Sequence, residues 1–178
     1  MSKYPQAYID YLIYFHSQRD YFECHEVLEE YWKEHPNDPL ATAYVGCIQV
    51  AVSLYHQRRG NLAGAVKMLQ SALKNFIESD LIKLGIEPDD FRAQLTARLA
   101  QLTAPDFQYE DLNIPLADAE LEEICVKQSI EKALMWQCYS DFSNTYLINK
   151  HTLRDRSVVI AERELSRQTK QAAKRVKE

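Results

Sequence analysis

The alternation of apolar and polar residues along the chain predicts helices. Apolar positions recur every three or four residues in most segments, which is the period of an amphipathic helix. The chain has only four glycines and no hairpin dipeptide such as Asn-Gly, so a fold rich in strands is disfavoured. The sequence therefore predicts an all-α fold.

The third predicted helix is expected at the centre of the fold. The predicted helices cover residues 5–16, 21–34, 39–59, 62–79, 89–102 and 118–139, and a last one starts near residue 152. Residues 43–56 (AYVGCIQVAVSLYH) are apolar almost all round, and such a helix must be surrounded by others. Residues 103–117 contain two prolines and no clear period, which indicates an extended connector.

These elements predict a single helical bundle of about five packed helices, with an extended arm and additional C-terminal helices. We expect residues 1–103 to form the bundle core. Residues 104–178 are then the connector arm and a C-terminal helical extension with a basic tail.

Helix boundaries are marked by local signals. Asp20 suits an N-cap, and Glu23 three residues later completes a capping box. Gly60 followed by Asn61 is typical of a tight corner between antiparallel helices. For the fifth helix, which follows Pro88, the cap is expected at residue 89 or 90.

The second helix carries a polar pair at the edge of its buried face. At 100° per residue, His25 and Glu29 lie one turn apart, whereas Glu26 falls on the solvent side. The two side chains are therefore placed to interact with each other and with a neighbouring helix.

The third helix carries one polar line on an otherwise apolar surface. Gln49, Ser53 and His56 share this line, and Arg59 follows about a turn later. Buried polar groups need hydrogen-bond partners, and the expected partners are the histidine and glutamates of the second helix. The candidate polar site is therefore His25, Glu26, Glu29, Gln49, His56 and Arg59.

Three interpretations of this site remain open. The first is a hydrogen-bonded network that only fixes helix register. The second is a metal site in which His25, Glu29 and His56 hold a divalent ion such as zinc, iron or manganese. The third is a metal-free site for acid–base chemistry, with Glu29 orienting His25.

Two function classes follow from these interpretations, and the sequence leaves open whether the protein is an enzyme. The leading prediction is a non-catalytic scaffold or protein-interaction module with a buried His/Glu/Gln network. The alternative is a small metal-dependent or acid–base enzyme, hydrolase-like, that uses His25, Glu29, Gln49 and His56. The zinc-protease motif H-E-x-x-H is incomplete, because its second histidine is missing.

Charge and composition limit the classes of partner that the protein is expected to bind. Residues 150–178 contain nine Lys or Arg against four Asp or Glu, while residues 1–149 contain 12 against 22. An acidic body makes nucleic acid an unfavourable partner, so we expect another protein or a second copy of the chain. The sequence predicts no membrane span and no secretory signal, and its four cysteines lack C-x-x-C spacing; these features favour the cytoplasm.

Two stretches carry a family resemblance. The first, residues 20–30 (DYFECHEVLEE) followed by Trp32, and the second, Gln49 through Asn61 with Gly64 and Ala65, resemble the bacterial and archaeal domain-of-unknown-function 309 family. The resemblance covers about residues 15–80 and implies a small cytoplasmic helical bundle. It implies no activity. Cys24 stands where that family commonly has a smaller residue.

Overall fold

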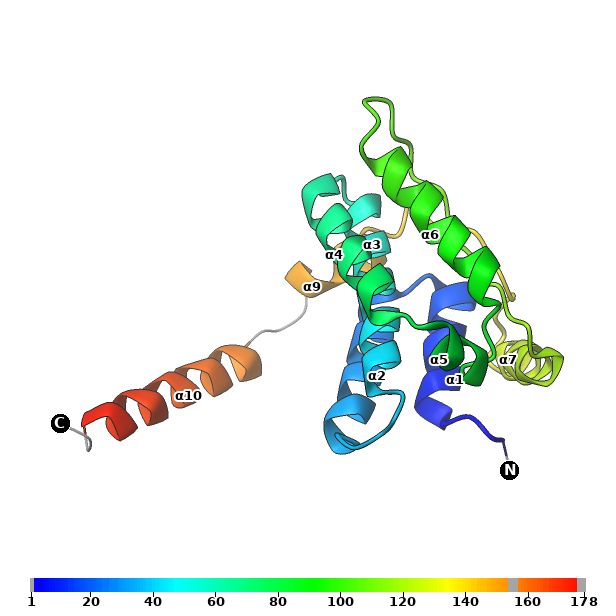
Figure 1. Cartoon of the computed structure of the whole chain (residues 1–178). Coiled ribbons are helices and arrows are strands. Elements are labelled where there is room, and N and C mark those ends of the chain that lie inside the picture. Colours follow the sequence, from blue (N-terminus) through cyan, green and yellow to red (C-terminus); the bar gives the residue numbers. More distant parts are fainter. Residues whose placement is uncertain (1, 154–156, 176–178) are drawn as a thin grey trace. The chain divides into compact units, whose positions relative to one another are not determined.

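The computed structural model describes residues 2–153 and 157–175, and this part of the chain forms helices without a strand (Figure 1). An isolated antiparallel bridge joins Ile86 and Leu116. The all-α prediction is therefore confirmed. The chain divides into two compact units, residues 1–148 and 149–178, which are described separately. This division does not test the boundary expected after residue 103, which stays a prediction.

The first unit is organised around α3. It contains α1 (Gln6–Ile13), the π-helix η1 (Tyr14–Gln18), α2 (Tyr21–Glu34), α3 (Ala41–Arg58), α4 (Leu62–Asn75), α5 (Glu78–Lys83), α6 (Pro88–Leu102), α7 (Ala119–Glu131) and α8 (Thr145–Ile148). Helix α3 packs against α2 and α4, α1 packs against α2 and α7, and α4 packs against α6. Twelve of the 18 residues of α3 are buried, so its predicted central position is confirmed.

Two glycines allow this packing for different reasons. Gly46 lets the ring of Phe76 lie against the backbone of α3, since a Cβ atom there would be 2.6 Å from a ring carbon. Gly60 ends the turn after α3 with a φ of 77°, and the Asn61 side chain accepts a hydrogen bond from Gly64 N (3.1 Å) to begin α4. The predicted corner is confirmed.

Several helix boundaries differ from the sequence prediction. The first helix changes to π geometry at Tyr14 instead of continuing regularly, and the predicted 62–79 helix ends at Asn75 before α5. The cap of α6 is Glu87, whose side chain accepts from Asp89 N, because Pro88 already occupies the first turn. Helix α7 ends at Glu131 rather than near 139.

The connector predicted for residues 103–117 lies along the bundle, as expected. In Figure 1 it runs beside α6 towards α7. Leu112 and Ile114 on the connector are buried, and Ile114 N donates to Nε2 of His16 (2.9 Å). The connector is therefore fixed to the N-terminal helices.

The second unit contains α9 (Lys150–Leu153) and α10 (Ser157–Arg175). The last helix, predicted to start near residue 152, thus corresponds to two helices, and the residues between them lie outside the described part. On α10, Ile160 and Leu165 are exposed. None of the described helices combines the length and apolar character that crossing a bilayer requires.

Candidate functional site

Helix α2 brings three predicted site residues together on one partly exposed face. The helix begins where the Asp20 carboxylate accepts a hydrogen bond from Glu23 N (3.1 Å), so the predicted cap is confirmed. His25, Glu26 and Glu29 each have 30 to 39% of their side chain exposed. Solvent and ions can therefore reach them.

The imidazole of His25 lies between the two carboxylates. Its Nδ1 atom is 2.9 Å from Glu26 Oε1, and its Nε2 atom is 3.1 Å from Glu29 Oε2. Lys33 pairs with the other oxygen of Glu29 at 2.7 Å. One ligand atom from each of His25, Glu26 and Glu29 falls within 4.8 Å of the others, an arrangement that could hold a metal ion.

The polar line of α3 takes its partners from the α4 side, which corrects the expected pairing with α2. Gln49 Oε1 accepts from Asn75 Nδ2 (2.8 Å), and Ser53 Oγ donates to the carbonyl of Ala65 (2.8 Å). The sequence did not predict these partners because α3 is apolar almost all round. The helical period alone does not determine which neighbouring helix a polar side chain of α3 faces.

His56 and Arg59 lie at the end of α3. His56 is half-buried, and its Nδ1 atom is 3.1 Å from Asn61 Nδ2. Burial and the neighbouring Arg59 lower the pKa of His56. Arg59 itself lies over the ring of Tyr55 at 5.3 Å. His56 is not among the ligand atoms that gather around His25, so the metal set containing His56 stays a prediction.

The sequence analysis did not single out a second polar cluster, which is centred on Arg19. This residue is 1% exposed and has a left-handed backbone (φ 52°) directly after the π-helix. Its Nε donates to the carbonyl of Cys138 (2.8 Å), and Nη1 donates to those of Phe15 (3.2 Å) and Leu112 (2.8 Å). Its Nη2 donates to Asn113 Oδ1 (2.6 Å). One guanidinium thus joins the π-helix to two later segments.

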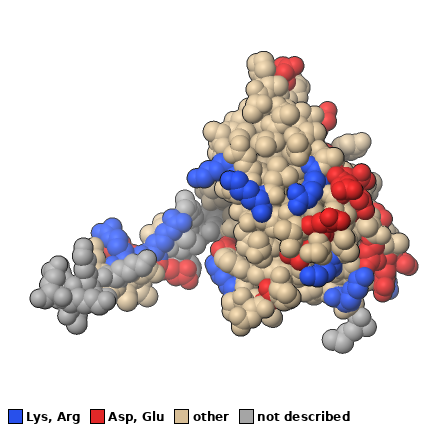
Figure 2. Space-filling view, in the orientation of Figure 1, with Lys and Arg blue, Asp and Glu red and all other residues tan. Residues whose placement is uncertain are grey.

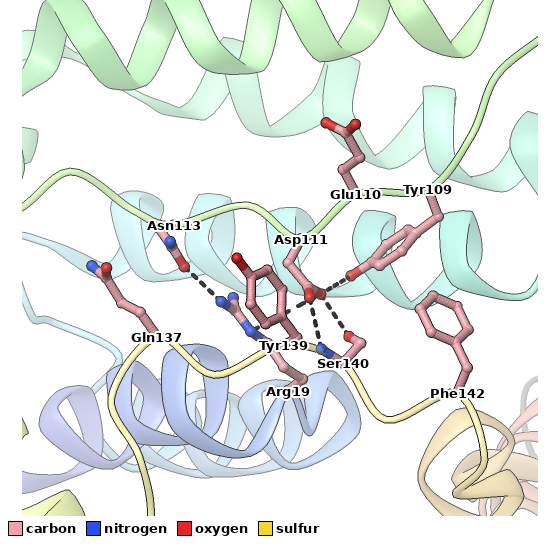
Figure 3. A pocket seen from close by; sticks show the side chains of 9 residues that line it. All are labelled: Arg19, Tyr109, Glu110, Asp111, Asn113, Gln137, Tyr139, Ser140 and Phe142. Atoms are coloured by element: carbon pink, nitrogen blue, oxygen red, sulfur yellow. Dashed lines mark hydrogen bonds and ion pairs between the residues drawn. The ribbon is translucent and has the colours of Figure 1, made fainter.

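Asp111 is the carboxylate nearest to this guanidinium, with Oδ1 4.0 Å from Arg19 Nε. It accepts hydrogen bonds from Ser140 Oγ (2.6 Å), Ser140 N (2.7 Å) and Tyr109 OH (2.9 Å), and Figure 3 shows these groups converging on it. Burial alone would raise the pKa of Asp111, but these hydrogen bonds and Arg19 outweigh it, so the pKa lies below its usual value. The group is therefore a fixed negative charge.

Arg58 adjoins this cluster, and only part of its hydrogen-bonding capacity is used. Its Nη1 donates to the carbonyl of Arg19 (2.8 Å) and to Ser140 Oγ (3.2 Å), and its guanidinium lies 4.7 Å from the ring centre of Tyr21. Its Nε and Nη2 atoms are buried and have no hydrogen-bond partner in the described structure. Burial raises the pKa of Tyr21 to about 12, so the ring stays neutral.

A cavity of about 550 Å³ opens beside the Arg19 cluster (Figure 3). Its lining includes the buried Arg19, the partly buried Asp111 and several aromatic side chains. Tyr139 is 88% exposed and Phe142 is 58% exposed, and the Phe142 ring meets Tyr109 edge-on at 5.7 Å. The cavity combines charged side chains at its base with exposed aromatic rings, which suits the binding of a ligand. It is less suited to proton transfer, because the lowered pKa of Asp111 keeps this carboxylate ionised.

Comparison with known proteins identifies the family. Residues 8–68 match the domain of unknown function DUF309. The chain is 42% identical to the uncharacterized protein YpuF of Bacillus subtilis (strain 168) over 164 residues, which are 90% of this chain and 93% of YpuF. An uncharacterized protein of Aquifex aeolicus (strain VF5) is 29% identical over 76 residues, 43% of this chain and 23% of that protein. No solved structure matches significantly. This chain therefore belongs to the DUF309 family and is a homologue of YpuF.

Proposed function

We propose that this protein is a non-catalytic helical binding module whose α2 site holds a divalent transition-metal ion such as zinc. The observation that carries the proposal is the approach of His25 Nε2 to Glu29 Oε2 (3.1 Å), with Glu26 Oε1 2.9 Å from the other ring nitrogen of His25. All three residues lie in the segment that matches DUF309. A function common to the family has to reside in that segment.

The distances suit a metal bound between His25 and Glu29. Two ligands of one tetrahedral ion lie about 3.4 Å apart when the metal–ligand bonds are about 2.1 Å. The Nε2–Oε2 distance of 3.1 Å therefore needs only a small side-chain adjustment. Glu26 has a different part: it accepts the Nδ1 proton of His25, which fixes the ring and leaves Nε2 free to bind the ion.

The same geometry supports a binding role over a catalytic one. Two protein ligands leave several coordination positions open, and the partly exposed side chains do not exclude water from the ion. A side chain from a partner protein, or from a second copy, can complete such a site. The proposal includes a cytoplasmic location, since the four cysteines are all free thiols in the described structure.

Zinc titration by calorimetry on the full chain, with elemental analysis, tests this proposal. We expect one zinc per chain, no stoichiometric zinc in His25→Ala or Glu29→Gln, and an affinity reduced roughly 10- to 100-fold in Glu26→Gln. His35→Gln is the matched control, because His35 is an exposed histidine at the end of the same helix. Unchanged zinc binding in His25→Ala, or an equal loss in His35→Gln, would refute the site.

A metal-dependent hydrolase is the second candidate, because an open coordination position can hold a water molecule instead of a partner's side chain. A water molecule bound to zinc in such a position becomes a nucleophile near neutral pH. Hydrolysis of an activated ester by the zinc-loaded chain, lost in His25→Ala and retained in His35→Gln, would support this function. Zinc binding without hydrolysis would leave the non-catalytic module.

A further inference from the structure

The connector contains a short extended arm, residues 107–111, with a regular alternation of burial. Phe107, Tyr109 and Asp111 are partly buried, whereas Gln108 and Glu110 are exposed. Figure 3 shows the same alternation, with Tyr109 and Asp111 on one side of the chain and Glu110 on the other. A period of two residues is the signature of an extended, strand-like backbone.

The backbone of this arm is unpaired. Within the described residues, no hydrogen bond reaches the main-chain N–H or C=O groups of residues 108–111. Just beyond, the Leu112 carbonyl accepts from Arg19 and Ile114 N donates to His16, so the arm is held firmly at its C-terminal end. An extended segment that is anchored but unpaired presents an open strand edge.

Two cavities border the arm, one on each side. The cavity of about 550 Å³ lies between the arm and residues 137–142, and another of about 380 Å³ lies between the arm and α6. Both are lined by Glu110, Asp111 and Asn113. A cavity thus reaches each flank of the arm, while the rings of Phe107 and Tyr109 pack against the core.

The chemistry around the arm indicates a cationic partner. Glu110 is exposed and lines both cavities, and the arginine that lines each of them, Arg19 or Arg98, is buried and hydrogen-bonded to other groups. In Figure 2 carboxylates gather on the side of the bundle where α7 lies. The exposed rings of Tyr139 and Phe142 stand over the larger cavity, and aromatic faces attract ammonium and guanidinium groups.

We propose that residues 108–111 bind an extended, basic peptide segment of a partner protein by backbone hydrogen bonds, with Tyr139 and Phe142 packing against its side chains. Pairing of a peptide with an open edge gives affinity through the main chain, and pockets for alternate side chains give specificity. This site is separate from the zinc site on α2, so either can be refuted without the other.

Nuclear magnetic resonance of the ¹⁵N-labelled full chain tests the proposal. The probe is the acetylated and amidated peptide Arg-Val-Arg-Val-Arg. We expect it to shift the amide signals of residues 108–111 and of the 137–142 segment at low salt. A twin with all backbone nitrogens methylated cannot donate main-chain hydrogen bonds and should bind at least tenfold more weakly. A second twin with citrulline replacing arginine has no charge and should also bind at least tenfold more weakly.

Protein variants then locate the contact. Tyr139→Ala should weaken binding about 3- to 30-fold, which corresponds to the loss of one cation–π contact. Ile130→Ala is the matched control, since Ile130 is an exposed apolar residue of α7 that does not line the cavity. Shifts confined to other surfaces, or equal binding of the N-methylated twin, would overturn the proposal. Signals of the arm that move on dilution of the protein alone would assign the edge to a second copy and overturn the foreign partner.

Discussion

Acidification should destabilise this protein through one buried histidine. His16 is inaccessible to solvent; its Nδ1 lies 2.9 Å from the Leu12 carbonyl, and its Nε2 accepts from Ile114 N (2.9 Å). Both bonds require the neutral ring with its proton on Nδ1. Burial, with a smaller contribution from Arg19, lowers the pKa of His16 from 6.5 to about 3.

The sign and size of the effect follow from proton linkage. Between pH 6.5 and 3 the unfolded chain binds a proton at His16 and the folded chain does not. The contribution of His16 is therefore fully present above the unfolded pKa and is lost as the pH falls. From pH 7 to pH 5 the free energy of unfolding should fall by about 2 kcal/mol because of this residue alone.

Urea unfolding at pH 7 and pH 5 measures this loss. His16→Gln keeps a donor and an acceptor but cannot titrate, so its free energy of unfolding should fall by about 2 kcal/mol less than that of the unmodified chain over the same interval. The other titrating groups are common to both proteins and cancel in the comparison. His35→Gln, at an exposed position, should behave like the unmodified chain. Equal losses in the unmodified chain and in His16→Gln would refute the reasoning.

Two further substitutions test the packing around the site. Arg19→Lys keeps the charge but not the planar fork with its four hydrogen bonds, and should lower the free energy of unfolding by about 2 to 4 kcal/mol in urea; a change below about 1 kcal/mol would contradict the assigned role. Gly46→Ala places a methyl group against the ring of Phe76 and should cost about 1 to 3 kcal/mol by thermal unfolding, whereas an unchanged melting temperature would show that the ring moves freely.

The features that the sequence predicted correctly depend on local geometry. The pairing of His25 with Glu29 followed from the helical period, because residues four apart on a helix are neighbours whatever surrounds them. The cap at Asp20 and the corner at Gly60 also depend on a few adjacent residues. Such features can be predicted correctly even where the predicted packing of the helices is wrong.

Interactions between distant segments escaped prediction for identifiable reasons. The π-helix shifts the register after Tyr14, so a regular period could not place His16 or Arg19. Arg19 and its acceptor Leu112 are 93 residues apart, and no local pattern marks a carbonyl as the partner of an arginine. A single arginine next to a predicted cap looks like an ordinary surface residue. The only indication in the sequence that it is buried was its position between two helices with buried faces.

The buried guanidinium of Arg19 also constrains how this family can have diversified. Three of its four hydrogen bonds go to residues 112, 113 and 138, all outside the segment that matches DUF309. A relative without those residues would keep only the Phe15 carbonyl as an acceptor, and nothing would hold an arginine there in its left-handed conformation. Glycine or asparagine, which suit the left-handed backbone, should therefore stand at that position in short relatives.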